Sequence, residues 1–293
     1  MNEVDNILGT KNNSERKNNY NQEKWKQIKD RQREWAYSTM EDMAQKIKID
    51  SKLFKDYLDV QSRFEKHSVG NSLLILAKFP NATQFKERQA WKDLGIPIKK
   101  NAQPIIILEP VKSEKTGKTY YNPKEVFDIS QTQAEGSETQ KEYNIRELLG
   151  GFIHNCYAEI KVVDELPDER IGGAYYDKEE NLLYVCRGME KDTLISSLSY
   201  ALAEIETRED ADNSLKDFKN KCISYMLCKR YGIDVSNYDF SYMPLEISSQ
   251  VNGKDVREEI DQIRVNFETI NSRITESFEQ SKEKKPKAKT QER

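Results

Sequence analysis

The first hundred residues carry apolar side chains three and four positions apart, which is the spacing of one face of a helix. Asp50 or Ser51 is suited to cap one such helix, and Ser68 to cap another, VGNSLLILAKF, whose apolar run predicts a buried helix. A later helix is expected to end at Gly95, because glycine commonly terminates helices. Ahead of these, residues 22–48 show helical periodicity through Trp25, Ile28, Trp35, Met40, Met43 and Ile47.

The period then changes to that of strands. The run PIIILEPV (104–111) is short and rich in β-branched residues, which predicts a strand, and KEVFDISQT (124–132) predicts another. The segment SEKTGKTYY between them predicts a hairpin with its turn at Thr116 and Gly117. The polar segment QAEGSETQKE that follows has no apolar periodicity and indicates a linker.

The second half mixes both kinds of element. We expect a short helix at 143–150, a strand at 152–164, helices at 190–207 and 213–231, and a long amphipathic helix at 254–280. The fold class is therefore predicted to be α+β, with an N-terminal helical region that carries a small antiparallel sheet and a C-terminal α+β domain. The expected organisation is a disordered leader (1–20), a first domain (21–132), a linker (133–142), a second domain (143–280) and a basic disordered tail (281–293).

Composition narrows the class of protein. Of 293 residues, 33% are charged, and no apolar run is long enough to span a membrane, so no membrane partner is expected. The polar N-terminus lacks the apolar core of a signal peptide, and the four scattered cysteines are expected to be free thiols in a reducing cytoplasm. Residues 1–130 hold 24 Lys and Arg against 18 Asp and Glu, whereas the rest hold 23 against 32. The first part therefore attracts anionic partners better than the second does.

The first half resembles a known family of DNA-binding domains. The string HSVGNSLLILAKFPNATQFKERQAWKDLGIPIKKNAQPIIILEP, closed by VFDISQT, is similar to the N-terminal single-stranded-DNA-binding domain of ArdC-type (LtrC-like) antirestriction proteins of conjugative elements. The resemblance covers roughly residues 22–132. It implies a sequence-tolerant single-stranded-DNA-binding domain, in which cations meet phosphates and exposed aromatic rings stack on bases.

The second half resembles the metallopeptidase domain that follows in that family. The string GGAYYDKEENLLYVCRGMEKDTLISSLSYALAE is similar to the hairpin and zinc helix of that domain, and NKCISYMLCKRYGIDVSNYDFSYM to its next helix. The resemblance implies a zincin-like fold. Its His-Glu-x-x-His positions fall on Ser196, Ser197 and Tyr200, and its third-ligand position on Lys221.

These four residues predict a degenerate metal site. Serine, tyrosine and lysine do not replace histidine and carboxylate as ligands of Zn²⁺ at neutral pH, so we expect no metal, no cofactor, no catalytic residue and no peptidase activity. Two interpretations of Lys221 stay open: an ion pair with Glu204 or Glu206 across the old site, or a side chain that reaches solvent.

The candidate DNA contacts lie in the first domain. Lys99 and Lys100 are expected in a loop before a strand, where phosphates are accessible. Two candidates have an alternative role: Trp91 as a core residue, and His67 as a helix cap. The full set is Arg63, Lys66, His67, Asn71, Arg88, Trp91, Lys92, Lys99 and Lys100.

Two functions from different classes follow. The first is a single-stranded-DNA-binding accessory protein of a mobile or conjugative element, acting in DNA transfer or antirestriction, with a dead peptidase-like domain as scaffold. The alternative is a protein-interaction module in which the dead cleft binds a relaxosome or restriction component and DNA binding is weak or lost. An active hydrolase with an unusual site is the least favoured.

Overall fold

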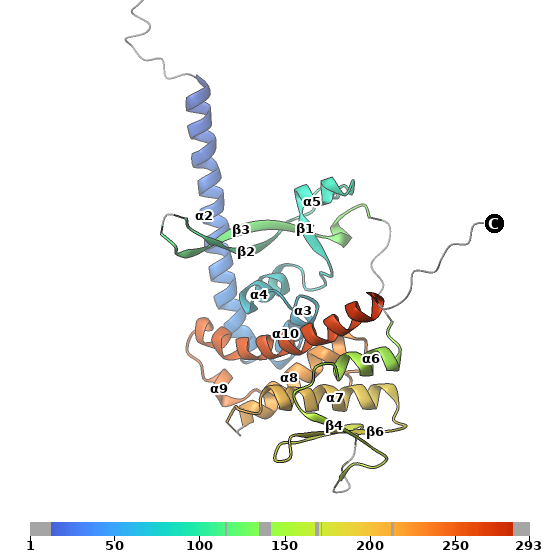
Figure 1. The fold of residues 1–293 in the computed structure, drawn as a ribbon. Helices are drawn as coiled ribbons and strands as arrows, with labels where there is room; N and C mark the ends of the chain where they lie inside the picture. Colours follow the sequence, from blue (N-terminus) through green and yellow to red (C-terminus); the bar gives the residue numbers. More distant parts are fainter. Residues whose placement is uncertain are drawn as a thin grey trace, which may run out of the picture.

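The protein is α+β, built from a helical region with a small sheet followed by a second helical region with its own sheet (Figure 1). The computed structural model describes residues 13–114, 116–134, 142–167, 170, 172–211 and 214–283, with side chains described from residue 22. The first region comprises α2 (Asn13–Ile47), α3 (Ser51–Arg63), α4 (Val69–Lys78), β1 (Phe85–Glu87), α5 (Arg88–Asp93), β2 (Ile105–Lys112), β3 (Thr119–Asp128) and the 3₁₀ helix η1 (Ile129–Gln131).

The predicted helix caps are present. The Asp50 side chain accepts a hydrogen bond from the Leu53 amide at 2.9 Å and begins α3. The Ser68 hydroxyl accepts one from the Asn71 amide at 3.3 Å and begins α4. These bonds satisfy amides that have no partner inside the helix, so each cap sets where its helix starts.

The first sheet is antiparallel, with strand order β1-β3-β2. Strands β2 and β3 form the predicted hairpin, in register from Ile105 opposite Val126 to Lys112 opposite Thr119. The turn contains Gly117 with φ of 67°, a backbone conformation that glycine adopts at no steric cost. The strand expected at 124–132 therefore begins earlier, because the exposed tyrosines after the turn pair with β2.

The second region begins after the expected linker, of which residues 135–141 lie outside the described part of the chain. Its sheet has the order β4-β6-β5, with β4 parallel and β5 antiparallel to β6. Its elements are α6 (Ile145–Phe152), β4 (Glu159–Val163), β5 (Ala174–Asp177), β6 (Leu182–Cys186), α7 (Lys191–Glu206), α8 (Ser214–Arg230), α9 (Leu245–Ser248) and α10 (Gly253–Glu283).

The strand predicted at 152–164 is only partly correct. Helix α6 runs to Phe152, and the strand is confined to 159–163. Asn144 accepts a hydrogen bond from the Glu147 amide (2.9 Å) while Glu147 accepts one from the Asn144 amide (3.4 Å). This reciprocal capping box commits the segment to a helix, and Phe152 and Leu148 are buried on its inner face.

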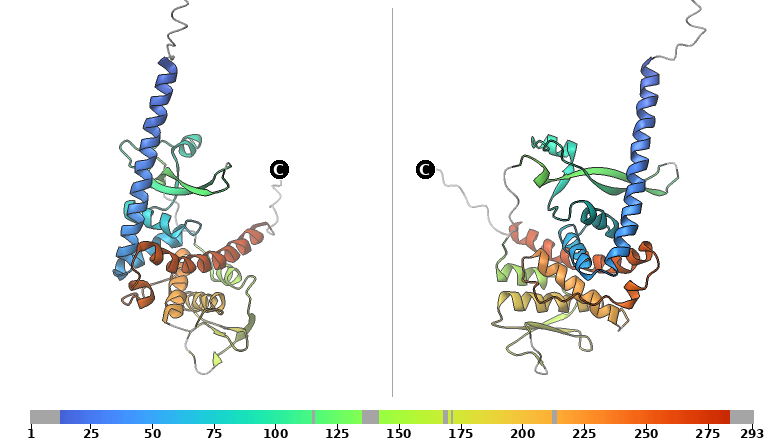
Figure 2. Two further views of the ribbon diagram at one scale, coloured as in Figure 1. Left: turned by 90° about the vertical axis from the view of Figure 1, so that its left-hand side faces the viewer. Right: turned by 180° about the vertical axis from the view of Figure 1, so that it is seen from behind.

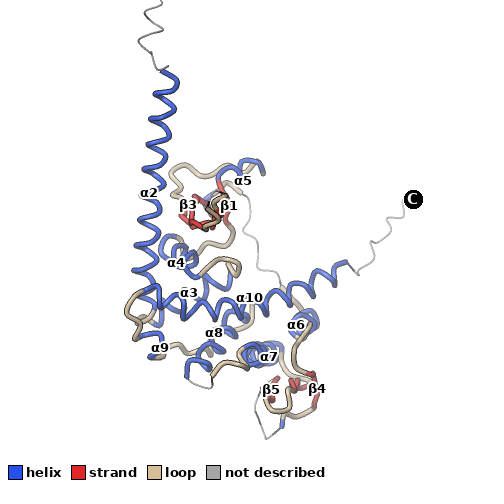
Figure 3. The backbone as a smooth tube through the Cα atoms, turned by 60° about the vertical axis from the view of Figure 1, so that its left-hand side comes forward, coloured by secondary structure: helices blue, strands red, loops and turns tan. Residues whose placement is uncertain are grey.

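The elements stack in layers along the molecule. Figure 3 shows the first sheet above α4 and α3, then α10 across the middle, then α8 and α7, and the second sheet beneath. One continuous cluster of buried apolar side chains runs through these layers, from Met43 of α2 to Ile274 of α10. The two expected domains share this core, and their boundaries stay a prediction.

Helices lie near both ends of the described chain. The helix α2 begins at Asn13 and the helix α10 ends at Glu283. The expected leader and tail, with their bounds, stay predictions. Residues 1–12 and 284–293 lie outside the described part of the chain.

Helix α2 extends past the rest of the molecule (Figure 2). Its C-terminal half packs into the core through Met40 and Met43, as its periodicity predicts. Its earlier apolar residues do not: the side chains of Trp25, Ile28 and Trp35 are 59%, 44% and 37% exposed. Among the described residues, no helix combines the length and apolar character that crossing a bilayer requires.

Candidate nucleic-acid interface

A basic hollow lies beside α5. Its volume is about 400 Å³. Arg88 and Lys92, one helical turn apart on α5, line one side, and residues 95–98 line the other. The Arg88 guanidinium lies 4.5 Å from the centre of the Phe127 ring, which orients it without neutralising its charge. We call this set of residues the basic hollow.

The wall opposite α5 is fixed by the way the helix ends. Gly95 has φ of 72°, and its amide donates to the Lys92 carbonyl at 2.9 Å, while the Ile96 amide donates to the Trp91 carbonyl at 3.0 Å. This left-handed glycine termination, predicted from the sequence, turns the chain back along α5. The apolar Ile96 and Ile98 therefore face the same hollow as the two cations.

The Lys99–Lys100 segment is held against η1 by backbone bonds. The Lys99 amide donates to the Gln131 carbonyl at 2.8 Å, and the Gln133 amide donates to the Pro97 carbonyl at 2.8 Å. The Lys99 ammonium donates to the Ser130 carbonyl at 2.8 Å, a neutral partner that leaves its charge uncompensated. Lys100 is exposed. Both cations thus lie on a fixed loop that continues from the hollow.

A buried carboxylate explains why VFDISQT and the Pro-Asn-Ala-Thr turn occur together. Asp128 is 1% exposed, and one of its oxygens accepts the amides of Thr83 (2.8 Å) and Gln84 (3.0 Å). The other accepts the amide (3.0 Å) and hydroxyl (2.6 Å) of Ser130. Four donors offset the cost of burying this carboxylate, so these motif residues build the site rather than contact a ligand.

Trp91 is a core residue, which corrects its place among the DNA contacts. It is 1% exposed, and its indole N–H donates to the Phe127 carbonyl at 2.8 Å. A base can stack only on an exposed ring face, so Trp91 does not offer one here. The alternative interpretation of this residue is the correct one.

Asn71 is also structural. It is 7% exposed, its amide donates to the Leu108 carbonyl at 2.9 Å, and its carbonyl oxygen accepts the Leu108 amide at 2.8 Å. The side chain pairs with the free edge of β2 as a neighbouring strand would. Because the amide oxygen and nitrogen both bond Leu108 and the side chain is buried, Asn71 is poorly placed to contact a phosphate or a base.

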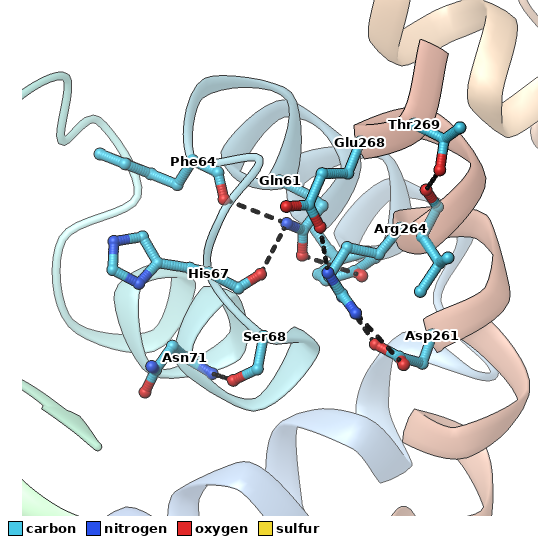
Figure 4. A network of polar contacts seen from close by, with 11 residues as sticks. Gln61, Phe64, His67, Ser68, Asn71, Asp261, Arg264, Glu268 and Thr269 are labelled. Atoms are coloured by element: carbon cyan, nitrogen blue, oxygen red, sulfur yellow. Dashed lines mark hydrogen bonds and ion pairs between the residues drawn. The ribbon is translucent and has the colours of Figure 1, made fainter. Parts of the chain in front are cut away.

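Arg63 and His67 have contacts within the fold as well. Figure 4 shows the segment after α3, where the Gln61 side-chain amide donates to the carbonyls of Phe64 and His67. The Arg63 guanidinium donates to the carbonyls of Ala82 (2.9 Å) and Pro80. The His67 ring lies 5.2 Å from that of Phe85, and burial lowers the pKa of His67, against a smaller opposing effect of Glu65. Of the candidates in this segment only Lys66 is exposed, so Lys66, the basic hollow and the Lys99–Lys100 loop remain as candidate cationic contacts.

The two serines of the degenerate metal site form hydrogen bonds within the fold. The Ser197 hydroxyl donates to the Thr193 carbonyl at 2.8 Å and accepts the Gly173 amide at 3.0 Å. The Ser196 hydroxyl donates to the Thr193 carbonyl at 3.2 Å. The backbone just before β5 thus packs directly on position 197 of α7, where the resemblance expects a general base.

Tyr200 and Lys221 do not complete a metal site either. Burial, together with Glu204 and Asp217, raises the pKa of Tyr200 to about 12, so the phenol stays protonated at neutral pH. The Lys221 ammonium donates to the Asp239 carbonyl at 2.9 Å, and Glu206 pairs instead with Arg273 at 2.5 Å.

The ion pair suggested between Lys221 and Glu206 is therefore wrong. Within the described residues, no three His, Cys, Asp or Glu side chains are grouped to hold a metal. Neutral hydroxyls, a protonated phenol and an ammonium do not fit a divalent metal.

A second hollow, of about 470 Å³, lies between β5, α7 and α8. Its lining carries both signs of charge: Glu204 and Asp217 are among its acidic residues, and Lys216 and Arg170 are among its basic residues. Lys216 is 7% exposed. Mixed charge of this kind suits a polar segment of a protein better than a polyanion.

Exposed aromatic side chains also occur in the first region, among them Tyr120 and Tyr121, either of which the sequence offers as a stacking group beside the nine candidate contacts. Tyr37 on α2 is 47% exposed, and Tyr120 and Tyr121 on β3 are 50% and 46% exposed. The sequence carries little signal that Trp25 is exposed, because Trp25 fits the same helical periodicity as the buried Met40. Trp25 is exposed and Met40 is buried because the N-terminal part of α2 projects beyond the core.

Comparison with solved structures finds a modest likeness to an antirestriction protein. No protein-family model and no curated protein matches it. The metal-free crystal structure of the antirestriction protein ArdC of plasmid R388 aligns with a TM-score of 0.45 and 13% identity, over 72% of this chain and 84% of that chain. Its Mn(II)-bound structure aligns with a TM-score of 0.47 and 13% identity, over 71% and 82%. At this level of similarity, neither comparison extends the activity of ArdC to this chain.

Proposed function

We propose that the protein is a single-stranded-DNA-binding accessory protein of a mobile or conjugative element, acting in DNA transfer or antirestriction. The observation that carries the proposal is the set of fixed cations around the basic hollow. Arg88 and Lys92 flank an apolar floor, and Lys99 and Lys100 continue the positive surface on a loop held by backbone bonds. This surface lies in the part of the chain with excess positive charge, and its residues match the string that resembles the ArdC-type domain.

Binding at this surface requires no chemistry on the DNA. The cations draw in phosphates and release their counterions, so affinity falls as salt rises. For single strands the slope of log K against log salt is about −0.7 per neutralised phosphate, so four cations correspond to a slope of about −3. Ile96 and Ile98 offer an apolar surface for a sugar or base edge without sequence readout.

The second region acts, in this proposal, as a catalytically inactive scaffold. Support comes from the hydrogen bonds that occupy Ser196 and Ser197, from the protonated Tyr200 and from the direction of Lys221. The shared hydrophobic core and the contacts of α8 with α3 give such a scaffold a physical task, which is to hold the first region in shape.

A binding titration of the full chain tests the proposal. Labelled single-stranded and duplex oligonucleotides are titrated over a range of salt, with Lys92→Gln/Lys100→Gln as the test variant. The matched control, Lys178→Gln/Lys254→Gln, removes the same charge from exposed positions of the second region. We expect the test variant to weaken single-strand binding and to reduce the salt slope by about 1.4, and the control to leave both unchanged.

Two results would contradict the proposal. One is an absence of single-strand binding by the full chain at low salt. The other is an equal response of the test and control variants, which would mean that net charge alone is responsible.

The mixed-charge hollow of the second region supports the alternative, a protein-interaction module. In that case the full chain binds no oligonucleotide but co-elutes with a purified relaxosome or restriction component. Glu204→Gln and Lys216→Gln, which change the lining of that hollow, would then weaken the complex.

A further inference from the structure

A row of aromatic and cationic side chains runs along the projecting part of α2. Trp25, Lys29, Arg33 and Tyr37 are four residues apart, so they follow one row of the helix surface over about 18 Å. The two aromatic side chains lie at the ends of this row, with the two cations between them. Trp25 is 59% exposed and Tyr37 is 47% exposed. With Tyr121 of β3 beside it, we call this row the aromatic ridge.

The two cations of the ridge are held by the part of β3 that lies beyond its pairing with β1. The Lys29 ammonium donates to the Pro123 carbonyl at 2.6 Å, and the Arg33 Nε donates to the Tyr121 carbonyl at 3.4 Å. The Lys29 ammonium also lies 5.8 Å from the centre of the Trp25 ring. A carbonyl is a neutral partner, so these bonds fix the position of Lys29 and leave its charge available to an anion.

The register of the hairpin directs the Tyr121 ring to the same side as α2. Tyr121 pairs with Pro110, so its side chain shares a face of the sheet with Leu108, two residues from Pro110. Leu108 packs against Ala36 and Met40 of α2. Tyr121 is nevertheless 46% exposed, because it lies nearer the hairpin tip than the packed part of that face.

We propose that the aromatic ridge is a second contact surface for single-stranded nucleic acid, on which bases stack against Trp25 and Tyr121 while Lys29 and Arg33 attract the phosphates. Stacking on aromatic rings tolerates any sequence, because every base has a π face. The inference rests on the proposed function, since the ligand is the same strand, but it uses other residues and another physical interaction. The basic hollow, by contrast, is lined by no aromatic side chain.

Charge favours a strand over an apolar protein partner on this surface. Residues 22–37 carry five Lys or Arg against three Asp or Glu, and the two inner members of the ridge are both cations. A helix that docks into a protein groove would instead place apolar residues at these inner positions. Arg33 also pairs with Asp30 at 2.8 Å, so Lys29 is the stronger site for a phosphate.

Fluorescence of the full-length protein tests the inference. An unlabelled oligothymidylate is titrated while tryptophan emission is followed, and a labelled one is titrated for affinity by anisotropy. The chain has three tryptophans, of which Trp91 is buried. Trp35 is the matched control, because it is exposed on α2 but lies two residues from Tyr37, on nearly the opposite side of the helix.

The expected result separates the ridge from the rest of α2. The oligonucleotide quenches emission of the wild type and of Trp35→Phe, and this quenching is lost in Trp25→Phe. Trp25→Ala and Tyr121→Ala each weaken binding by about fivefold or more, as loss of one stacked base does. Trp35→Ala and Tyr242→Ala, an exposed tyrosine of the second region, leave the affinity unchanged.

The outcomes distinguish failure of the ridge from failure of the proposed function. If the wild type binds single strands, Lys92→Gln/Lys100→Gln weakens binding, and both Trp25→Ala and Tyr121→Ala bind as the wild type does, the ridge alone is refuted. Equal loss of affinity in Trp25→Ala and Trp35→Ala also refutes it. If the wild type binds no oligonucleotide, both the proposed function and the ridge fail.

Discussion

Substitution of Asn71 by alanine distinguishes a structural role from a DNA contact. The change removes both hydrogen bonds that the side chain makes with the buried edge of β2, at 2.9 Å and 2.8 Å. The Leu108 amide and carbonyl are then left without partners in a position where Leu108 is 6% exposed. Each buried group left unsatisfied costs about 1–3 kcal/mol, so the expected loss is about 2–6 kcal/mol.

One effect opposes this loss. Asn71 lies in the first turn of α4, and alanine is the better helix former by about 0.5 kcal/mol. A net loss of about 1.5–5.5 kcal/mol remains. For a chain of this size it lowers the unfolding temperature by roughly 2–9 °C.

The assay is urea unfolding followed by circular dichroism, paired with single-strand binding under native conditions. The control is Asn122→Ala, a half-buried position on β3 where we expect a change within about 0.5 kcal/mol. An Asn71→Ala protein that unfolds as the wild type does but binds DNA more weakly would refute the structural interpretation. The side chain would then contact the strand, and its pairing with Leu108 would be dispensable.

Two further predictions concern the contacts after α3. Arg230→Lys removes a guanidinium that pairs with Glu65 at 2.9 Å and donates to the Ser62 carbonyl at 2.8 Å. Since an ammonium lacks the planar fork of a guanidinium, we expect the free energy of unfolding in urea to fall by about 1–3 kcal/mol and amide hydrogen exchange at residues 62–68 to become faster. Unchanged exchange at these residues would contradict the role of the contact. Because burial depresses the pKa of His67 below its ordinary value, the unfolded state binds protons more readily, so stability is full above about pH 6.5 and falls as pH drops through the lowered folded-state pKa. His67→Gln should flatten that dependence whereas His154→Gln should not, and an identical pH profile of the unfolding temperature in wild type and His67→Gln would exclude His67 as the source.

Much of the helical framework follows from periodicity and caps alone. Asp50, Ser68 and Gly95 act locally, through backbone groups three or four residues away, so a single sequence carries their signal. The hairpin was equally local, because its turn needs Gly117 in a left-handed conformation. The segment 152–164 was misjudged because its apolar run is shared between the end of α6 and β4, and length alone did not separate them.

The candidate site was predicted less well than the fold. Its exposed cations, Lys92, Lys99 and Lys100, were identified from the sequence. Asn71 and Trp91 were not separable from contact residues, because their partners lie 37 and 36 positions away along the chain. A polar or aromatic residue in a motif has the same signature whether it binds a ligand or holds a distant strand, and only the tertiary contacts decide.

The packing of Gly172 and Gly173 on α7 restricts which side chains position 197 can hold. A side chain at Gly173 would meet the Leu194 backbone at 2.6 Å, and one at Gly172 would meet the Ser197 hydroxyl at 3.0 Å. A glutamate at 197 would have to occupy the same volume as that strand entry, so a carboxylate there demands a shifted backbone as well as a new side chain. Positions 172, 173, 194 and 197 are therefore expected to vary together, since a larger side chain at one of them requires a compensating change at another.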